Sequence, residues 1–292
     1  MISIFKDDKA EMEYYHFYDK SLEMVGTPYS TKNIQTSFGE THILVFGDLS
    51  KKPLLLLHGM TMSSTMWYPN IKHLISERCV FAIDTIGDFG KSKAKTMIKN
   101  KKQAAQWLLE VMDGLKLDSC DLGGHSMGGF LALNFAITYP ERVSKLLLFA
   151  PAATFSKMSP LIFIKIYPAL LFHTEKLIDK AFLWFSGTKK PLHPIFRDQV
   201  IAGYSNAKPV LRVMPSVFTE EVFQNFHPPT LLLVGENEVI YPARKTIANA
   251  KRYIPNLETQ IIPGANHSLT IEYADIVNEQ IINFLVKNNG NK

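Results

Sequence analysis

The chain has 292 residues, 46% of them hydrophobic and 20% charged, which suits one large α/β domain or two small ones. Its net charge of +5 is mild, and the densest lysine runs, residues 91–102 and 189–190, contain no interleaved aromatic side chains. Composition and charge therefore exclude nucleic acid as a favoured partner.

The sequence shows no targeting or metal-binding signal. The first fifteen residues are acidic where a secretory signal is basic and then apolar. The longest apolar run, residues 160–172, contains Lys165 and Pro168 and is too short to span a bilayer. Cys79 and Cys120 lie in apolar runs, where reduced core thiols are expected. We expect a cytoplasmic protein with no metal, no cofactor and no stable membrane association; the pattern leaves its oligomeric state open.

Short apolar runs alternate with segments of helical period along most of the chain. This alternation predicts an α/β fold, a mainly parallel sheet with helices on both faces. Helices are expected at residues 7–24, 67–77, 101–114, 127–139, 243–250 and 276–286. Eight strands are expected, at residues 33–37, 41–46, 53–57, 79–84, 120–123, 145–149, 230–234 and 259–262.

Residues 151–228 interrupt this alternation. Apolar residues recur there at helical spacing, prolines break the pattern repeatedly, and no strand-like run is bounded by turn signals. We interpret the stretch as a helical cap, inserted into an α/β core made of residues 1–150 and 229–292.

The strongest local motif is Gly124-His125-Ser126-Met127-Gly128, which fits G-x-S-x-G. An apolar strand ends at it and a helical pattern begins, as the motif requires. A serine on so tight a turn needs neighbours without bulk, and the turn then projects its hydroxyl above the sheet. The pattern predicts Ser126 as a nucleophile.

A serine hydroxyl is a weak nucleophile and needs a base held by a third group. His267 follows the last predicted strand, on the sheet edge where Ser126 also lies. Glu236 and Glu238 both follow the strand at 230–234. We prefer Glu238 as the orienting acid, because it lies three residues beyond the turn glycine Gly235, whereas Glu236 is expected to face solvent.

Two backbone N–H groups are expected to bind a developing oxyanion. The first belongs to Met127, at the start of the helix after Ser126. The second belongs to Met60, because Gly59 lets the loop after the strand 53–57 turn sharply. His58 is expected to bond within that loop.

The segment Gly87-Asp88-Phe89-Gly90-Lys91-Ser92 looks like the end of a phosphate-binding loop. Thr85 stands where that motif needs its first glycine, so nucleotide binding is rejected. We interpret the segment as a surface turn after Asp84.

These motifs together resemble the α/β-hydrolase superfamily, and most closely its bacterial esterase and lactonase-like members with a helical cap. The resemblance extends from about residue 33 to residue 284 and implies the eight-stranded sheet and the roles of Ser126, Glu238 and His267. Most relatives carry aspartate at the position of Glu238.

Within this superfamily a serine nucleophile disfavours dehalogenases and epoxide hydrolases, which use aspartate. The hypothesis is a carboxylic ester hydrolase acting on a small apolar ester, with Met62, Phe163 and Ile166 in its substrate pocket. Four alternatives stay open: a small-molecule receptor with little turnover, an acyltransferase, a lactonase and a thioesterase.

Overall fold

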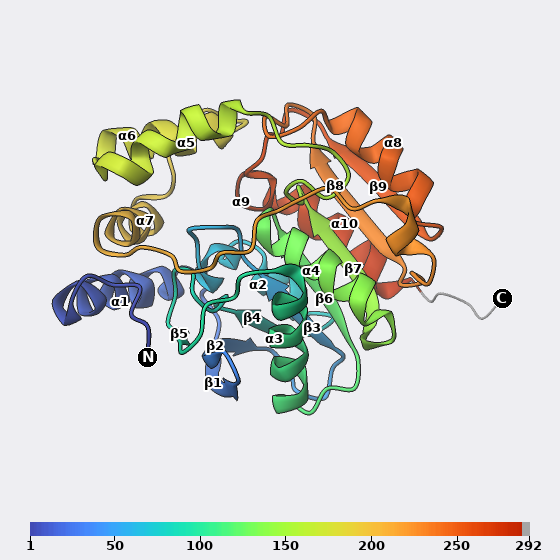
Figure 1. The fold of residues 1–292 in the computed structure, drawn as a ribbon, viewed down its shortest axis with the longest axis horizontal. Coiled ribbons are helices and arrows are strands. Elements are labelled where there is room, and N and C mark those ends of the chain that lie inside the picture. Colours follow the sequence, from blue (N-terminus) through green and yellow to red (C-terminus); the bar gives the residue numbers. More distant parts are fainter. Residues whose placement is uncertain (288–292) are drawn as a thin grey trace.

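Nine strands form one sheet in the computed structural model, which describes residues 1–287 (Figure 1). The strands are β1 Tyr29–Thr36, β2 Gly39–Phe46, β3 Pro53–Leu57, β4 Cys79–Ile83, β5 Lys93–Ala94, β6 Cys120–His125, β7 Val143–Phe149, β8 Thr230–Gly235 and β9 Leu257–Ile262. Their order is β1-β2-β4-β3-β6-β7-β8-β9, and β5 pairs with β2. Pairs from β4 to β9 are parallel, whereas those of β2 are antiparallel. The mainly parallel sheet of eight strands is confirmed, with the two-residue β5 as an unpredicted addition.

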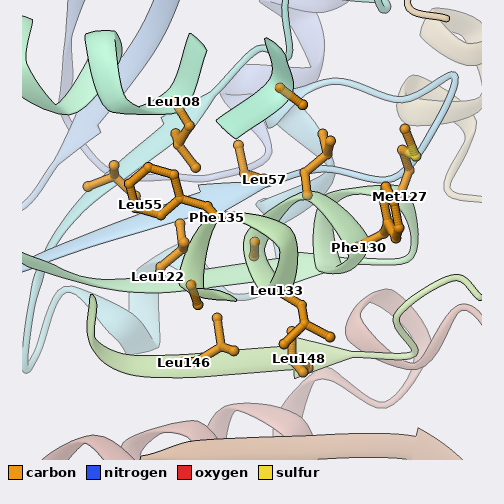
Figure 2. Packing of buried hydrophobic residues seen from close by; sticks show 14 of the residues in the cluster. Leu55, Leu57, Leu108, Leu122, Met127, Phe130, Leu133, Phe135, Leu146 and Leu148 are labelled. Carbon is orange, nitrogen blue, oxygen red and sulfur yellow. The ribbon is translucent and has the colours of Figure 1, made fainter. Parts of the chain in front are cut away.

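Alternate side chains of the central strand β3 belong to two separate hydrophobic clusters. Leu55 and Leu57 pack in one and Leu54 and Leu56 in the other, and all four are fully buried. A strand covered on both faces therefore reads as a continuous apolar run. Figure 2 shows the first cluster, where strand leucines lie beside Phe130 and the other side chains of the helix after Ser126.

Helices cover both faces of the sheet (Figure 1). The first cluster includes α3 Lys101–Gly114, α4 Met127–Thr138 and α8 Ala243–Tyr253. The second includes α1 Asp8–Glu23, α2 Ile71–Leu74, α9 Leu269–Glu272 and α10 Ala274–Val286. Short 3-10 turns occur at Ser64–Trp67, Pro140–Arg142 and Glu220–Phe223.

The prediction of one helix over residues 67–77 is wrong. A 3-10 turn ends at Trp67, and α2 spans only Ile71–Leu74. Pro69 between them lacks an N–H and disfavours helical geometry in the residue before it. Asn70 lies at the break and donates from its side chain to the carbonyl of Thr270, at 3.0 Å.

The region between β7 and β8 is helical, as predicted. It contains α5 Leu161–Phe172, α6 Glu175–Phe185 and α7 Pro194–Asn206, and no strand lies among these described residues. Helices α5 and α6 lie at the periphery of the molecule, with α7 beside α1 (Figure 1). Treating residues 151–228 as a separate cap remains a proposal.

The prediction of a surface turn at residues 84–92 is wrong. Asp84, Asp88 and Phe89 are at most 2% exposed. The chain after α7 covers the turn, since the N–H groups of Val210 and Leu211 both donate to the Gly87 carbonyl. A loop of glycines and polar residues is predicted to be exposed when the segment that covers it is more than a hundred residues away in the sequence.

Two sequence-based expectations concern single residues and membrane crossing. Cys79 and Cys120 are free and buried, as predicted. Among the helices that the structure describes, none is long and apolar enough to cross a membrane.

Candidate active site

Ser126 occupies the turn between β6 and α4, with φ 53° and ψ −113°. This conformation is strained for a residue with a side chain. Its neighbours leave no room for one: a Cβ on Gly124 would lie 2.2 Å from the Gly128 carbonyl oxygen. A Cβ on Gly128 would lie 2.2 Å from the carbonyl oxygen of Leu57. The turn therefore requires glycine at both positions.

Backbone hydrogen bonds hold the strained turn in place. The Ser126 N–H donates to the Phe149 carbonyl at the end of β7, at 2.9 Å. The Ser126 carbonyl accepts from the N–H groups of Phe130 and Ala152, each at 3.0 Å. The nucleophile candidate is thus fixed by two adjacent parallel strands and a helix.

Three predicted side chains meet at the carboxyl edge of the sheet. His267 Nε2 lies 2.9 Å from Ser126 Oγ. His267 Nδ1 lies 3.0 Å from Oε2 and 3.2 Å from Oε1 of Glu238. Because an ionised carboxylate only accepts hydrogen bonds, Nδ1 carries the proton and Nε2 presents its lone pair to the serine hydroxyl. This is the geometry of a nucleophile, its base and an orienting acid.

Glu238, rather than Glu236, contacts the His267 ring. The Glu238 side chain is fully buried, and its Oε1 also accepts from the Ile240 N–H at 2.9 Å. Glu236 is exposed and its Oε2 accepts from the Gly264 N–H instead, at 2.9 Å. The two carboxylates therefore lie in different environments although they are two residues apart.

His125 supports the histidine loop, a contact that sequence reasoning missed. Its Nε2 lies 2.8 Å from the His267 carbonyl oxygen, and the two ring centroids are 5.0 Å apart. Burial, then the neighbouring His267, lower the pKa of His125 to about 3. The neutral ring therefore donates to the His267 backbone. In the sequence, only the position of His125 next to Ser126 could have indicated this contact.

Comparisons with known proteins show the family. Residues 52–185 match the α/β hydrolase fold family. The chain is 35% identical to the uncharacterized carboxylesterase nap of Bacillus subtilis over 286 residues, 96% of this chain and 94% of that one. The chain belongs to the α/β-hydrolase family.

Further similarity supports the carboxylesterase branch of that family. Carboxylesterase YbfK of Bacillus subtilis is 32% identical over 95% of each chain. The crystal structure of a naproxen esterase from the same organism is 34% identical, with a TM-score of 0.90 over 96% of this chain and 99% of that one. The predicted α/β-hydrolase fold is confirmed.

In this hydrolase the loop after β3 lies directly beside Ser126. A Cβ on Gly59 would lie 3.7 Å from the Ser126 Cβ. The next N–H, that of Met60, has no hydrogen-bond acceptor within residues 1–287. Met127 is the first residue of α4, so its N–H has no acceptor within the helix. The use of these two N–H groups as oxyanion donors remains a prediction.

His58 bonds within its own loop, as expected. It is 1% exposed, its Nδ1 lies 2.8 Å from the Gly59 carbonyl oxygen, and its Nε2 accepts from the Thr85 N–H at 2.9 Å. Burial lowers its pKa. Both ring nitrogens are occupied, so His58 has a structural role.

The three predicted pocket residues lie in different surroundings. Met62 lines a cavity of about 10 Å³ whose wall contains neither Ser126 nor His267. Phe163 on α5 is 56% exposed, and Ile166 is half-buried. Their part in substrate binding therefore remains a prediction.

The end of α6 covers the histidine loop, a contact for which no sequence pattern is a signal. The Phe185 ring lies 5.2 Å from the His267 ring, and the Phe185 carbonyl accepts from the Ser268 N–H. Glu272 accepts from the N–H groups of Gly187 and Thr188, at 2.9 and 3.0 Å. Helix α6 thus forms one wall above the base.

The site holds no cluster suited to a metal. No group of three or more His, Cys, Asp and Glu side chains within residues 1–287 is placed to hold a metal ion.

Proposed function

We propose that the chain hydrolyses small carboxylic esters through an acyl-enzyme on Ser126. One observation carries the proposal: the hydroxyl of Ser126, whose backbone is strained, lies 2.9 Å from His267 Nε2, and Glu238 Oε2 lies 3.0 Å from Nδ1 of the same ring. The branch of the family to which the chain belongs consists of carboxylic ester hydrolases, which agrees with this chemistry.

In the first step His267 Nε2 takes the proton of Ser126 as its oxygen attacks the ester carbonyl. The ring becomes cationic, and the buried carboxylate of Glu238 stabilises it. The N–H groups of Met60 and Met127 bind the oxyanion. His267 then gives its proton to the departing alcohol, leaving an acyl group on Ser126.

In the second step water attacks the acyl-enzyme while His267 takes its proton. The same two N–H groups bind the second oxyanion. The proton returns to Ser126 as the carboxylic acid leaves. No metal or organic cofactor takes part in either step.

An apolar substrate fits the surroundings of the site. Met60 and Met62 lie on the loop beside Ser126, and methionine adapts to irregular apolar shapes. Phe163 and Ile166 belong to α5, whose large apolar side chains are mostly exposed. We assign these side chains to the acyl or alcohol group.

The test is steady-state hydrolysis of p-nitrophenyl acetate, butyrate and octanoate. Ser126→Ala removes the nucleophile and should abolish turnover. Glu238→Gln can present an amide proton to Nδ1 and so favour the wrong tautomer, and it should lower kcat by about 10²- to 10⁴-fold. Glu236→Gln is the matched control and should retain activity near that of wild type.

Other outcomes would identify the other functions. A burst of about one equivalent without turnover would favour a receptor with little turnover. Transfer of the acyl group to an added alcohol or amine would favour an acyltransferase, and preference for cyclic esters would favour a lactonase. Full activity in Ser126→Ala would contradict the proposal itself.

A further inference from the structure

Asp88 is a buried acid that the proposed mechanism does not use. It follows β4 in the covered turn and is 2% exposed. Within residues 1–287 no Lys, Arg or His side chain forms an ion pair with it. A buried carboxylate without a cation needs hydrogen bonds to offset the loss of its hydration.

Those hydrogen bonds come from the loop beside Ser126. The Thr61 N–H points to both carboxylate oxygens of Asp88, each at 3.1 Å. The Phe89 N–H donates to Oδ1 at 2.8 Å. Thr61 has φ 57°, a left-handed conformation that a β-branched residue rarely adopts. Asp88 thus holds a strained residue through that residue's own N–H.

The strained residue directly follows Met60, whose N–H is proposed to bind the oxyanion. The peptide that joins Met60 to Thr61 contains the Met60 carbonyl and the Thr61 N–H, and the Met60 N–H belongs to the peptide before it. A tilt of the held peptide would therefore reach the Met60 N–H through the Met60 Cα. The Thr61 side chain also restrains this point, because its Oγ1 donates to the Met60 carbonyl. The one proton of Oγ1 is used in that bond, so the hydroxyl of Tyr204 on α7 is the donor in its 2.8 Å contact with Thr61 Oγ1.

We infer that Asp88 is a positioning residue: its ionised carboxylate holds Thr61 and so keeps the Met60 N–H aimed at the oxyanion. The inference rests on the proposed function, because it needs an oxyanion at Ser126. Asp88 touches no substrate and acts only through the Thr61 backbone.

Loss of the Asp88 charge should weaken this hold. A neutral carboxyl group keeps one strong acceptor oxygen in place of two. The N–H groups of Thr61 and Phe89, which together make three contacts with the two oxygens, would then compete for that one oxygen. Burial, and after it the charge of Asp84, raise the pKa of Asp88 to about 7, although the Phe89 and Thr61 N–H groups oppose the rise. Burial is the main cause that raises the pKa of the hydroxyls of Tyr14 on α1 and Tyr204 on α7, and the charge of Asp88 in turn adds to that rise.

The test compares wild type with Asp88→Asn on p-nitrophenyl butyrate between pH 5.5 and 8.5. At pH 8.5 the variant should have a kcat about tenfold lower, with KM within about threefold, because only transition-state binding is affected. The kcat ratio of wild type to variant should then fall towards one below pH 7, where Asp88 of the wild type becomes neutral.

Asp121→Asn is the matched control. Asp121 is also buried and its pKa is also raised, but it accepts from Arg78 at the opposite end of β6 from Ser126. Its kcat ratio to wild type should not change with pH. A constant ratio for Asp88→Asn as well would overturn the inference, because a merely structural role lowers stability without a pH-dependent change in kcat.

Two further results separate the possible failures. If Asp88→Asn does not fold by circular dichroism, the wild-type kcat profile decides. Protonation of the base His267 alone lowers log kcat by at most about one per pH unit, so a steeper fall below pH 7 supports the inference, and a slope of one or less overturns it. If Ser126→Ala remains active, the proposed function fails. If Ser126→Ala is inactive while Asp88→Asn behaves as wild type at every pH, only the inference about Asp88 fails.

Discussion

At the scale of single residues, the Ser126 turn depends on the absence of side chains beside it. Gly124 and Gly128 each pack a backbone oxygen where a Cβ would stand, at 2.2 Å. Such an overlap cannot be relieved by rotating a side chain, because the opposing atom belongs to the backbone. The fold and the nucleophile therefore share the same constraint.

Gly124→Ala should lower the free energy of unfolding by about 3 kcal/mol or prevent folding, because β6 and α4 must separate. Gly26→Ala is the control: Gly26 has φ 63° but nothing within 4 Å of its position for a Cβ. That change should lower stability by only about 1 kcal/mol. Chemical denaturation measures both, and equal losses would contradict the packing argument.

At the scale of elements, the end of helix α6 packs against the loop that carries His267. Helix α6 ends on the histidine loop, and Gly187 packs so closely there that a Cβ on it would lie 2.7 Å from the Gly264 carbonyl oxygen. Glu272, in α9, accepts the two N–H groups that follow α6. The position of this helix end thus depends on one carboxylate beyond the base.

Glu272→Ala should release the end of α6 from the histidine loop. Amide hydrogen exchange of residues 186–188 should become faster, and KM should rise more than kcat falls, because a binding wall is loosened while the three reacting groups stay in place. Glu279→Ala, on the exposed face of α10, should leave exchange and KM unchanged. Unaltered exchange in Glu272→Ala would contradict this role.

At the scale of the whole molecule, buried titratable groups act on stability in opposite directions. The pKa of His125 is lowered from 6.5 to about 3, so between these values only the unfolded chain binds that proton, and stability falls as the pH falls. The pKa of Asp88 is raised from 3.8 to about 7, so in that window the folded chain binds the proton and stability rises as pH falls. The two effects oppose each other between about pH 6.5 and pH 4.

Below that window the contributions no longer oppose each other. Burial disfavours the ionised form of Asp84, yet hydrogen bonding and charge from His42 lower its pKa to about 2, so its stabilisation is lost as pH falls from 3.8 towards 2. Wild-type Tm should therefore vary little from pH 7 to 4 and then drop. Asp88→Asn lacks the opposing contribution, so its Tm should begin to fall near pH 6.5. Parallel Tm curves for the two proteins would contradict this balance.

Most elements could be predicted from the sequence because each has a local pattern. The leucine run of β3 indicates a buried strand, and the acidic N-cap Asp7 precedes a helix that begins at Asp8. The predicted helix over residues 67–77 was wrong at Pro69. The start of β1 was missed because residues 29–32 are all exposed and show no alternation of burial. Sequence patterns therefore predict helices and strands well only where buried positions recur at a regular spacing along the chain.

The sequence by itself determined the fold family, the Ser126 turn and the loops that carry Glu238 and His267, because each depends on a few adjacent residues. Only the tertiary structure decided that Glu238 rather than Glu236 reaches His267, that Phe185 covers the base, and that Asp88 binds Thr61. These contacts join segments distant in sequence: His125 and the His267 carbonyl are 142 residues apart. Such pairs leave no periodic signal, since their spacing is set by the packing of the elements between them.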